Sequence, residues 1–193
     1  GGHASYPASI EQDGEHYLLP EISEWSRQAI FRVEGNRAEK VADLDIEAPG
    51  LLDPTPLRHD GKLYLFANRA DEGSAILRLW TADSLFGRFE EHPASPVRCS
   101  IRGSRMAGPI RQWPAGLIRS GQDLRSGYGD GILAFRIAEL TPHRYREEEI
   151  GSAAFARVKG PHTVDLQDST LLFDWYDERF DPLAGVRRLL HRW

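Results

Sequence analysis

One pattern occurs twice in this chain at a fixed interval, and it limits the possible folds more than any other feature. The spacing Pro-x-x-apolar-x-x-Asp-Gly-x-x-Tyr-Leu covers residues 7–18 and returns 47 positions later over residues 54–65. In both copies an Asp-Gly pair lies between apolar and aromatic segments, and such a pair supplies the positive φ angles of a tight two-residue turn. Each copy therefore predicts a β-hairpin, and the fixed interval predicts a repeat architecture.

The repeat continues, more weakly, through the rest of the chain. Similar intervals give four equivalent start positions, Tyr6, Asp53, Ala107 and Pro161. The third hairpin turn is then expected at residues 114–115 and the fourth at 168–169. A further strand is predicted after each of the first three hairpins, at residues 29–33, 75–80 and 131–137, and another around 41–46 and 89–97. The charged run 144–149 predicts a solvent-exposed outer edge.

Four strands in about 45 to 55 residues match the size of one propeller blade. The sequence therefore predicts an all-β, propeller-type fold in a single domain over residues 1–193. Its repeats are expected at about 5–47, 53–97, 107–150 and 160–180, with a C-terminal tail at 181–193. Because the first unit begins directly after Gly1, Gly2 and His3, and a closed ring needs its first and last blades to meet, we expect one blade to be missing at the N-terminal side.

Composition narrows the range of partners. The 193 residues are 40% hydrophobic, which is enough for one packed core, and the net charge of −5 comes without a basic stripe, so nucleic acid is not an expected partner. Cys99 is the only cysteine and no Cys/His metal spacing occurs, so we expect no internal disulfide, no metal and no cofactor. No apolar run approaches the ~20 residues of a membrane span. We expect a soluble, cytoplasmic protein, with a bacterial-surface location as the open alternative.

Several segments together carry a family resemblance: residues 3–7, 18–21, 53–55, 63–66, 82–87, 104–108, 122–123, 128–131 and 160–163. In their order and spacing they resemble the five-bladed β-propeller superfamily of glycoside hydrolase family 43. Within it, the chain looks most like the N-terminal domain of glucosamine inositolphosphorylceramide transferases and its bacterial homologues. The resemblance implies five blades, of which about four are present, a carbohydrate-related role, and a fused or associated transferase domain.

The same resemblance allows a test for enzyme chemistry. In the hydrolases the starts of the inner strands supply two Asp and one Glu, because one carboxyl must protonate the leaving oxygen while another activates water. Among the four start positions here only Asp53 is acidic, and the expected Glu-Gly-Pro motif falls on Ala107, Gly108 and Pro109. The triad is incomplete, so ordinary hydrolysis is disfavoured. Asp53 remains the one catalytic candidate, although Asp before Pro is also a common turn starter.

The candidate substrate-binding residues are Tyr6, Glu21, Arg105, Gln122, Asp123, Tyr128 and His162. Glu21 lies near an aromatic residue, as in many sugar sites, although the sequence favours a structural role in which it caps a loop after Pro20. Arg105 could bind a phosphate or a sugar carboxylate, or form a salt bridge between blades. Gln122, Asp123 and Tyr128 belong to the densest polar group of the chain. His162 is either an acid or base, or a histidine with satisfied hydrogen bonds.

These observations favour a carbohydrate-recognition or accessory domain linked to a sugar-modifying transferase and non-hydrolytic by itself. The expected ligand is a carbohydrate or a sugar-containing small molecule. One alternative is a family 43-like glycoside hydrolase acting through carboxylates in the central funnel, and another is a structural scaffold. Whether the chain is an enzyme stays open at this point: it could be glycosidase-like or part of a glycosyl- or formyltransferase.

Overall fold

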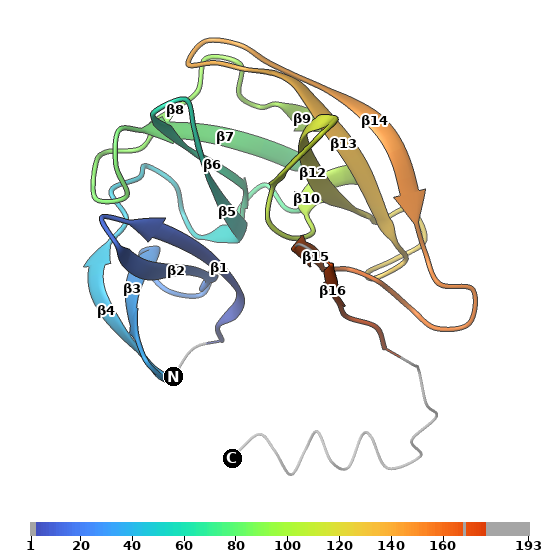
Figure 1. Ribbon diagram of the computed structural model, residues 1–193, viewed down its shortest axis with the longest axis horizontal. Coiled ribbons are helices and arrows are strands. Elements are labelled where there is room, and N and C mark those ends of the chain that lie inside the picture. Colours follow the sequence, from blue (N-terminus) through green and yellow to red (C-terminus); the bar gives the residue numbers. More distant parts are fainter. Residues whose placement is uncertain (1–2, 168, 177–193) are drawn as a thin grey trace.

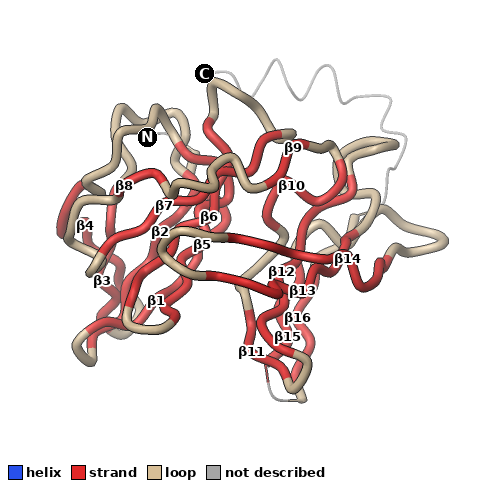
Figure 2. Tube along the Cα trace, turned by 90° about the horizontal axis from the view of Figure 1, so that it is seen from above, coloured by secondary structure: helices blue, strands red, loops and turns tan. Residues whose placement is uncertain are grey.

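The computed structural model describes residues 3–167 and 169–176, so the predicted tail at 181–193 lies outside the described residues. Within this range all regular structure is β-strand, and Figure 2 shows strands and loops with no helix. The all-β prediction is confirmed.

Four antiparallel sheets follow one another along the chain. The first contains β1 (Ser5–Gln12), β2 (Glu15–Glu21), β3 (Ala29–Glu34) and β4 (Arg37–Asp43). The second contains β5 (Leu51–His59), β6 (Lys62–Arg69), β7 (Ile76–Ala82) and β8 (Glu90–Glu91), and β9 (Arg98–Cys99) also pairs with β7. The third contains β10 (Arg102–Met106), β12 (Gly116–Asp123), β13 (Ile132–Leu140) and β14 (Tyr145–Ala153), and β11 (Arg111–Trp113) pairs with β12. The fourth pairs β15 (Val164–Gln167) with β16 (Thr170–Phe173).

The sheets form an arc in which the first strands, β1, β5, β10 and β15, lie nearest the middle (Figure 1). Within each sheet, strands that are consecutive in sequence are neighbours in space, apart from the short additions β9 and β11. This meandering order is that of a propeller blade. The arc is not closed into a ring, and the number of five blades stays a prediction.

The two Asp-Gly hairpins have the turn geometry that the sequence predicts. Asp13 and Gly14 have φ angles of 55° and 79°, and Asp60 and Gly61 have 46° and 76°. Positive φ at both central residues defines the turn whose twist suits a two-residue hairpin. In the third sheet Trp113 pairs with Gly116, which leaves the expected two residues, 114 and 115, as the connection.

The further strands at 29–33, 75–80 and 131–137 are confirmed as β3, β7 and β13. The predicted outer strands were only partly right. The first begins at Arg37, because Glu34 pairs with Arg37 across a tight turn. In the second, only two residues pair as β8. Pro93 and Pro96 interrupt this stretch, since proline has no N–H to donate to a neighbouring strand.

β6 shows where the core lies. Its residues are buried on both faces, as expected for the second strand of a sheet that is covered on both sides. Leu63, Leu65 and Ala67 pack into a cluster with residues of the first sheet. Tyr64 and Phe66 pack into a second cluster with residues of the third sheet. Because successive strand residues point to opposite faces, one strand joins both interfaces, and these interfaces fix the inner strands relative to one another.

Candidate functional site

Asp53 lies in an irregular turn of β5. The pairing of β5 with β6 shifts register between Leu52 and Thr55, and Asp53 has a φ of 46°. This left-handed conformation costs a residue with a side chain on the order of 1 kcal/mol or more, so neighbouring contacts must hold it. The Asp53 N–H donates to Glu21 Oε2 at 2.9 Å. Glu21 thereby stabilises the turn that directs the buried Asp53 carboxyl toward the third sheet.

Arg105 on β10 connects three sheets. Its Nε donates to Asp53 Oδ2 at 2.7 Å and its Nη2 donates to Glu21 Oε2 at 3.0 Å. Its Nη1 donates to Ser74 Oγ, in the connection between β6 and β7, at 3.1 Å. All three nitrogens therefore already have protein partners. Of the two interpretations that the sequence allowed for Arg105, the structure contains the salt bridge between sheets.

Gln122 completes this group, which we call the central cluster: Glu21, Asp53, Arg105 and Gln122. Gln122 Nε2 donates to Asp53 Oδ2 at 3.1 Å and to Met106 O at 2.9 Å. Both partners are acceptors, so this network fixes which end of the amide is nitrogen. Gln122 Oε1 is consequently left buried without a hydrogen-bond partner.

The central cluster offers acceptor atoms in excess of donors. Besides Gln122 Oε1, neither Asp53 Oδ1 nor Glu21 Oε1 receives a hydrogen bond from the described residues. For Gln122 Oε1, which is buried, the missing donor costs about 1–3 kcal/mol. The arrangement is therefore complementary to a group that donates hydrogen bonds, such as a hydroxyl, an ammonium or water.

Burial has the largest effect on the pKa of the Asp53 carboxyl. Loss of water raises the pKa of its carboxyl, the positive charge and hydrogen bond of Arg105 lower it, and the neighbouring Glu21 carboxylate raises it again. The resulting pKa is about 7. Near neutral pH, Asp53 is thus poised between the neutral acid and the carboxylate.

Tyr6 occupies the same place in the first sheet that Asp53 occupies in the second. Its φ is also 46°, and the pairing of β1 with β2 shifts register at the same place. The Tyr6 hydroxyl contacts Thr55 Oγ1 at 2.9 Å and accepts the N–H of Gly108 at 2.8 Å. Burial and the charge of Asp53 raise the pKa of Tyr6, so its hydroxyl stays protonated. Since Thr55 in turn donates to Asp53 O, Tyr6 supports the backbone of the central cluster.

A second group surrounds the start of β15. His162 Nδ1 forms an ion-pair contact with Asp174 Oδ2. Asp174 Oδ1 accepts the N–H groups of His162 and Thr163 at 3.0 and 2.7 Å. The ring of Tyr128 lies 4.7 Å from that of His162, centroid to centroid. The structure thus brings two more of the predicted residues together.

Comparison with known proteins identifies the family of this chain. The family described as "Glucosamine inositolphosphorylceramide transferase 1, N-terminal" matches residues 1–167. The chain belongs to this family. The resemblance found in the sequence is therefore confirmed.

Two plant relatives of this N-terminal domain are similar over most of the chain. Glucosamine inositolphosphorylceramide transferase 1 of Oryza sativa subsp. japonica is 27% identical over 164 residues, which cover 82% of this chain and 22% of the relative. The protein of the same name in Arabidopsis thaliana is 27% identical over 168 residues, which cover 83% of this chain and 22% of the relative. The chain thus spans little more than a fifth of the length of these relatives.

Solved structures with a similar fold are glycoside hydrolases. A family 117 enzyme of Zobellia galactanivorans has a TM-score of 0.60 at 17% identity, over 82% of this chain and 48% of the enzyme. An exo-β-1,3-galactanase of Phanerochaete chrysosporium has a TM-score of 0.56 at 8% identity, over 92% of this chain and 44% of the enzyme. At such identities the likeness concerns the fold alone, which is propeller-like in both cases.

Asp123, although adjacent to Gln122 in sequence, makes different contacts. Its carboxylate accepts hydrogen bonds from Arg125 Nε at 3.0 Å and Nη2 at 2.8 Å. These bonds lower the pKa of Asp123. Because successive strand residues alternate between faces, Gln122 and Asp123 at the end of β12 point apart. In this N-terminal domain, Asp123 therefore stabilises the loop after β12, while Gln122 joins the central cluster.

The sequence analysis missed three residues of these two groups: Thr55, Ser74 and Asp174. Thr55 and Ser74 act through single hydroxyls, which leave no pattern in the sequence. Asp174 did leave a signal, since it directly follows the apolar strand β16, where an acid often begins a loop.

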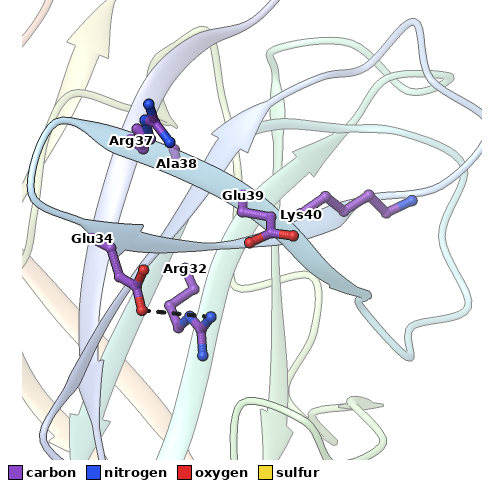
Figure 3. A pocket seen from close by; sticks show the side chains of 6 residues that line it. All are labelled: Arg32, Glu34, Arg37, Ala38, Glu39 and Lys40. Carbon is purple, nitrogen blue, oxygen red and sulfur yellow. Dashed lines mark ion pairs between the residues drawn. The ribbon is translucent and has the colours of Figure 1, made fainter.

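One hollow of the described surface lies away from the central cluster. It is lined by residues 32, 34 and 37–40 of the β3–β4 hairpin, at the outer edge of the first sheet (Figure 3). Arg32 and Glu34 form a 3.6 Å ion pair there, and charges of both signs alternate around the hollow. Such an exposed, self-neutralising surface is typical of an outer strand, so we place the candidate site on the inner strands instead.

Among the described residues, no three His, Cys, Asp or Glu side chains are grouped so that they could hold a metal ion. The described residues also contain no helix long and apolar enough to cross a membrane.

Proposed function

We propose that this domain recognises a carbohydrate at the central cluster and serves a sugar-modifying transferase as an accessory part, without cleaving glycosidic bonds by itself. The observation that carries the proposal is a set of acceptor atoms that receive no hydrogen bond from the described residues: Gln122 Oε1, Asp53 Oδ1 and Glu21 Oε1. Sugar hydroxyls are donors of the required kind and can reach several acceptors at once.

The charges of the central cluster favour a neutral sugar over an anionic ligand. The central cluster holds two carboxyl groups and one guanidinium, and each guanidinium nitrogen already has a protein partner. A phosphate or carboxylate would meet the carboxyl oxygens of Glu21 and Asp53 without a free cation to balance the repulsion. The site therefore favours a neutral, hydroxyl-rich group.

The comparisons support the same class of ligand. The relatives are named glucosamine inositolphosphorylceramide transferase 1, and the structural neighbours are glycoside hydrolases, one of them solved with β-1,3-galactotriose. We also propose that the sheets belong to a ring of five blades, because the inner strands already surround a common centre.

A titration of sugars tests this function. Calorimetry would use three matched pairs of probes: methyl β-galactopyranoside with β-1,3-galactotriose, methyl β-glucopyranoside with cellotriose, and methyl β-xylopyranoside with xylotriose. We expect at least one pair to bind the wild type. Gln122→Met should weaken that binding about tenfold or more, because it removes the amide oxygen and the hydrogen bond that Gln122 donates to Asp53.

Gln112→Met is the matched control, since Gln112 is an exposed glutamine on β11. Thermal unfolding shows whether Gln122→Met is folded, and Asp53→Asn, which keeps the side-chain shape, is a second variant if it is not. Binding of none of the six probes, or equal affinity in wild type, Gln122→Met and Asp53→Asn, would contradict the proposal.

One observation favours glycoside hydrolysis as a second candidate. Asp53 has a raised pKa of about 7 beside the carboxylate of Glu21, and a neutral carboxylic acid next to a carboxylate is what glycosidases use. If the chain hydrolyses glycosides, it should release nitrophenol from p-nitrophenyl galactosides, glucosides or xylosides, and Asp53→Asn should abolish the release. Absence of turnover by the wild type, together with sugar binding, would leave recognition as the function.

A further inference from the structure

Tyr128 is an exposed aromatic residue whose backbone is held by the segments flanking the fourth sheet. Its side chain is 53% exposed, and its carbonyl accepts the hydroxyl of Tyr176 at 2.6 Å. Two residues further on, Asp130 Oδ1 accepts Lys159 Nζ at 2.7 Å. Lys159 and Tyr176 are themselves joined by two backbone hydrogen bonds of 2.9 Å. The loop is therefore clamped while the ring faces solvent.

Gly129 lies in close contact with the ring of Tyr176. It has a φ of 74°, and a Cβ placed there would lie 2.6 Å from an atom of the Tyr176 ring. Only glycine fits such a contact. An aromatic side chain on a fixed backbone has only two χ angles to order on binding, which is why such residues contribute strongly to ligand recognition.

His162 is oriented as firmly as Tyr128. Asp174 is fixed by two backbone N–H groups and contacts His162 Nδ1. The Asp174 carboxylate at Nδ1 fixes the orientation of the ring and leaves Nε2 as the ring nitrogen available to a ligand. Among the described residues, Nε2 has no hydrogen-bond partner. His162 thus presents a ring nitrogen that can hydrogen-bond to a ligand beside the Tyr128 ring.

This pair adjoins the central cluster. Val164, at the start of β15, donates its N–H to Ala107 O at 2.8 Å, and Ala107 lies two residues after Arg105. Partial burial raises the pKa of Tyr128, and the nearby charges of Asp53 and Arg105 shift it in opposite directions. The Tyr128 phenol therefore lies within electrostatic reach of Asp53 and Arg105 of the central cluster.

We propose that Tyr128 and His162 form a second sugar subsite next to the central cluster, in which a pyranose ring packs on Tyr128 and forms a hydrogen bond through a hydroxyl with His162 Nε2. The inference rests on the proposed function and makes it more specific: the ligand is a glycan of at least two sugar units, with one unit at the central cluster and its neighbour at this subsite.

The three probe pairs test the subsite directly. For the sugar that binds, the trisaccharide should bind the wild type about tenfold more tightly than the methyl glycoside. Tyr128→Ala should remove this gain and leave the affinity for the methyl glycoside unchanged. Tyr128→Phe keeps the ring and should retain most of the gain. His162→Gln should reduce it, whereas the control His143→Gln, at an exposed turn between β13 and β14, should not.

Each outcome has a separate meaning. If no probe binds, the proposed function fails, and the subsite fails with it. If probes bind and depend on Gln122, but the trisaccharide gains nothing or keeps its gain in Tyr128→Ala, the central cluster stands and the second subsite is wrong. Because the Tyr128 side chain is mostly exposed, these variants are expected to fold, and thermal unfolding checks this.

Discussion

At the scale of single residues, Asp53 combines backbone strain, burial and an ion pair. Its left-handed backbone is held by Glu21, its carboxyl by Arg105 and Gln122, and its pKa is raised chiefly by burial. Sites that bind or transform ligands are where such strain and pKa shifts concentrate. Asp53 therefore both connects the sheets and lies at the centre of the candidate site.

The raised pKa makes the stability of the domain depend on pH in a defined direction. The folded carboxyl has a pKa of about 7, against 3.8 when free, so between these values the folded state holds more protons than the unfolded state. The wild-type free energy of unfolding should therefore fall, through this group, as the pH rises from about 4 to 7. Asp53→Asn lacks the effect.

Urea unfolding at several pH values measures this difference. The free energy of unfolding of Asp53→Asn relative to wild type should increase with pH, by at most about 1.4 kcal/mol per pH unit. Asp60→Asn is the matched control, since Asp60 has the same φ of 46° but lies in an exposed turn. The account would be wrong if the free energy of unfolding differed between wild type and Asp53→Asn by the same amount at every pH from 4 to 8. Asp53 would then not be desolvated in the folded state.

At the scale of elements, the third sheet contains a buried ion pair. Arg119 on β12 is fully buried and donates to both carboxylate oxygens of Glu147 on β14, at 2.7 and 2.8 Å. Tyr145 donates to the same carboxylate at 2.6 Å, and the Arg119 guanidinium lies 4.4 Å from the Phe135 ring centroid. Burial raises the pKa of Glu147, but the charge and hydrogen bonds of Arg119 lower it. The resulting pKa is below its usual value, and both groups are charged.

Glu147 corrects one expectation from the sequence. The run 144–149 predicted a solvent-exposed edge, yet the Glu147 side chain is only 6% exposed. The period of two along β14 places Tyr145 and Glu147 on the same inward face, and the matching arginine lies among the apolar residues of β12. Only the pairing of the strands reveals that the two charges meet.

Breaking this pair should destabilise the domain strongly. Glu147→Gln leaves the Arg119 charge buried without a counter-ion and should cost about 3–5 kcal/mol. Glu148→Gln, the neighbour on the exposed face, should have little effect on stability, since the Glu148 and Arg136 side chains of its ion pair are each 43% exposed. Denaturant unfolding of the two variants compares them directly, and equal effects would refute the account of this sheet.

At the scale of the whole molecule, the sequence predicts the units better than their assembly. The Asp-Gly turns, and the strands that become β3, β7 and β13, follow from local patterns, because turn geometry and alternation are local properties. Glu21, Asp53, Arg105 and Gln122 could each be singled out. Their convergence could not be predicted, since they come from three sheets and meet only through packing between those sheets.

The central claim is that ligand hydroxyls fill the free acceptors of the central cluster, and the Gln122 side chain reports on this most directly. We would record its amide NMR signals, assigned with Gln122→Met, while titrating the best-binding methyl glycoside. The account predicts shifts that saturate in step with calorimetric binding, while the signals of Gln112 stay constant. Saturating binding that leaves the Gln122 signals unmoved would contradict it.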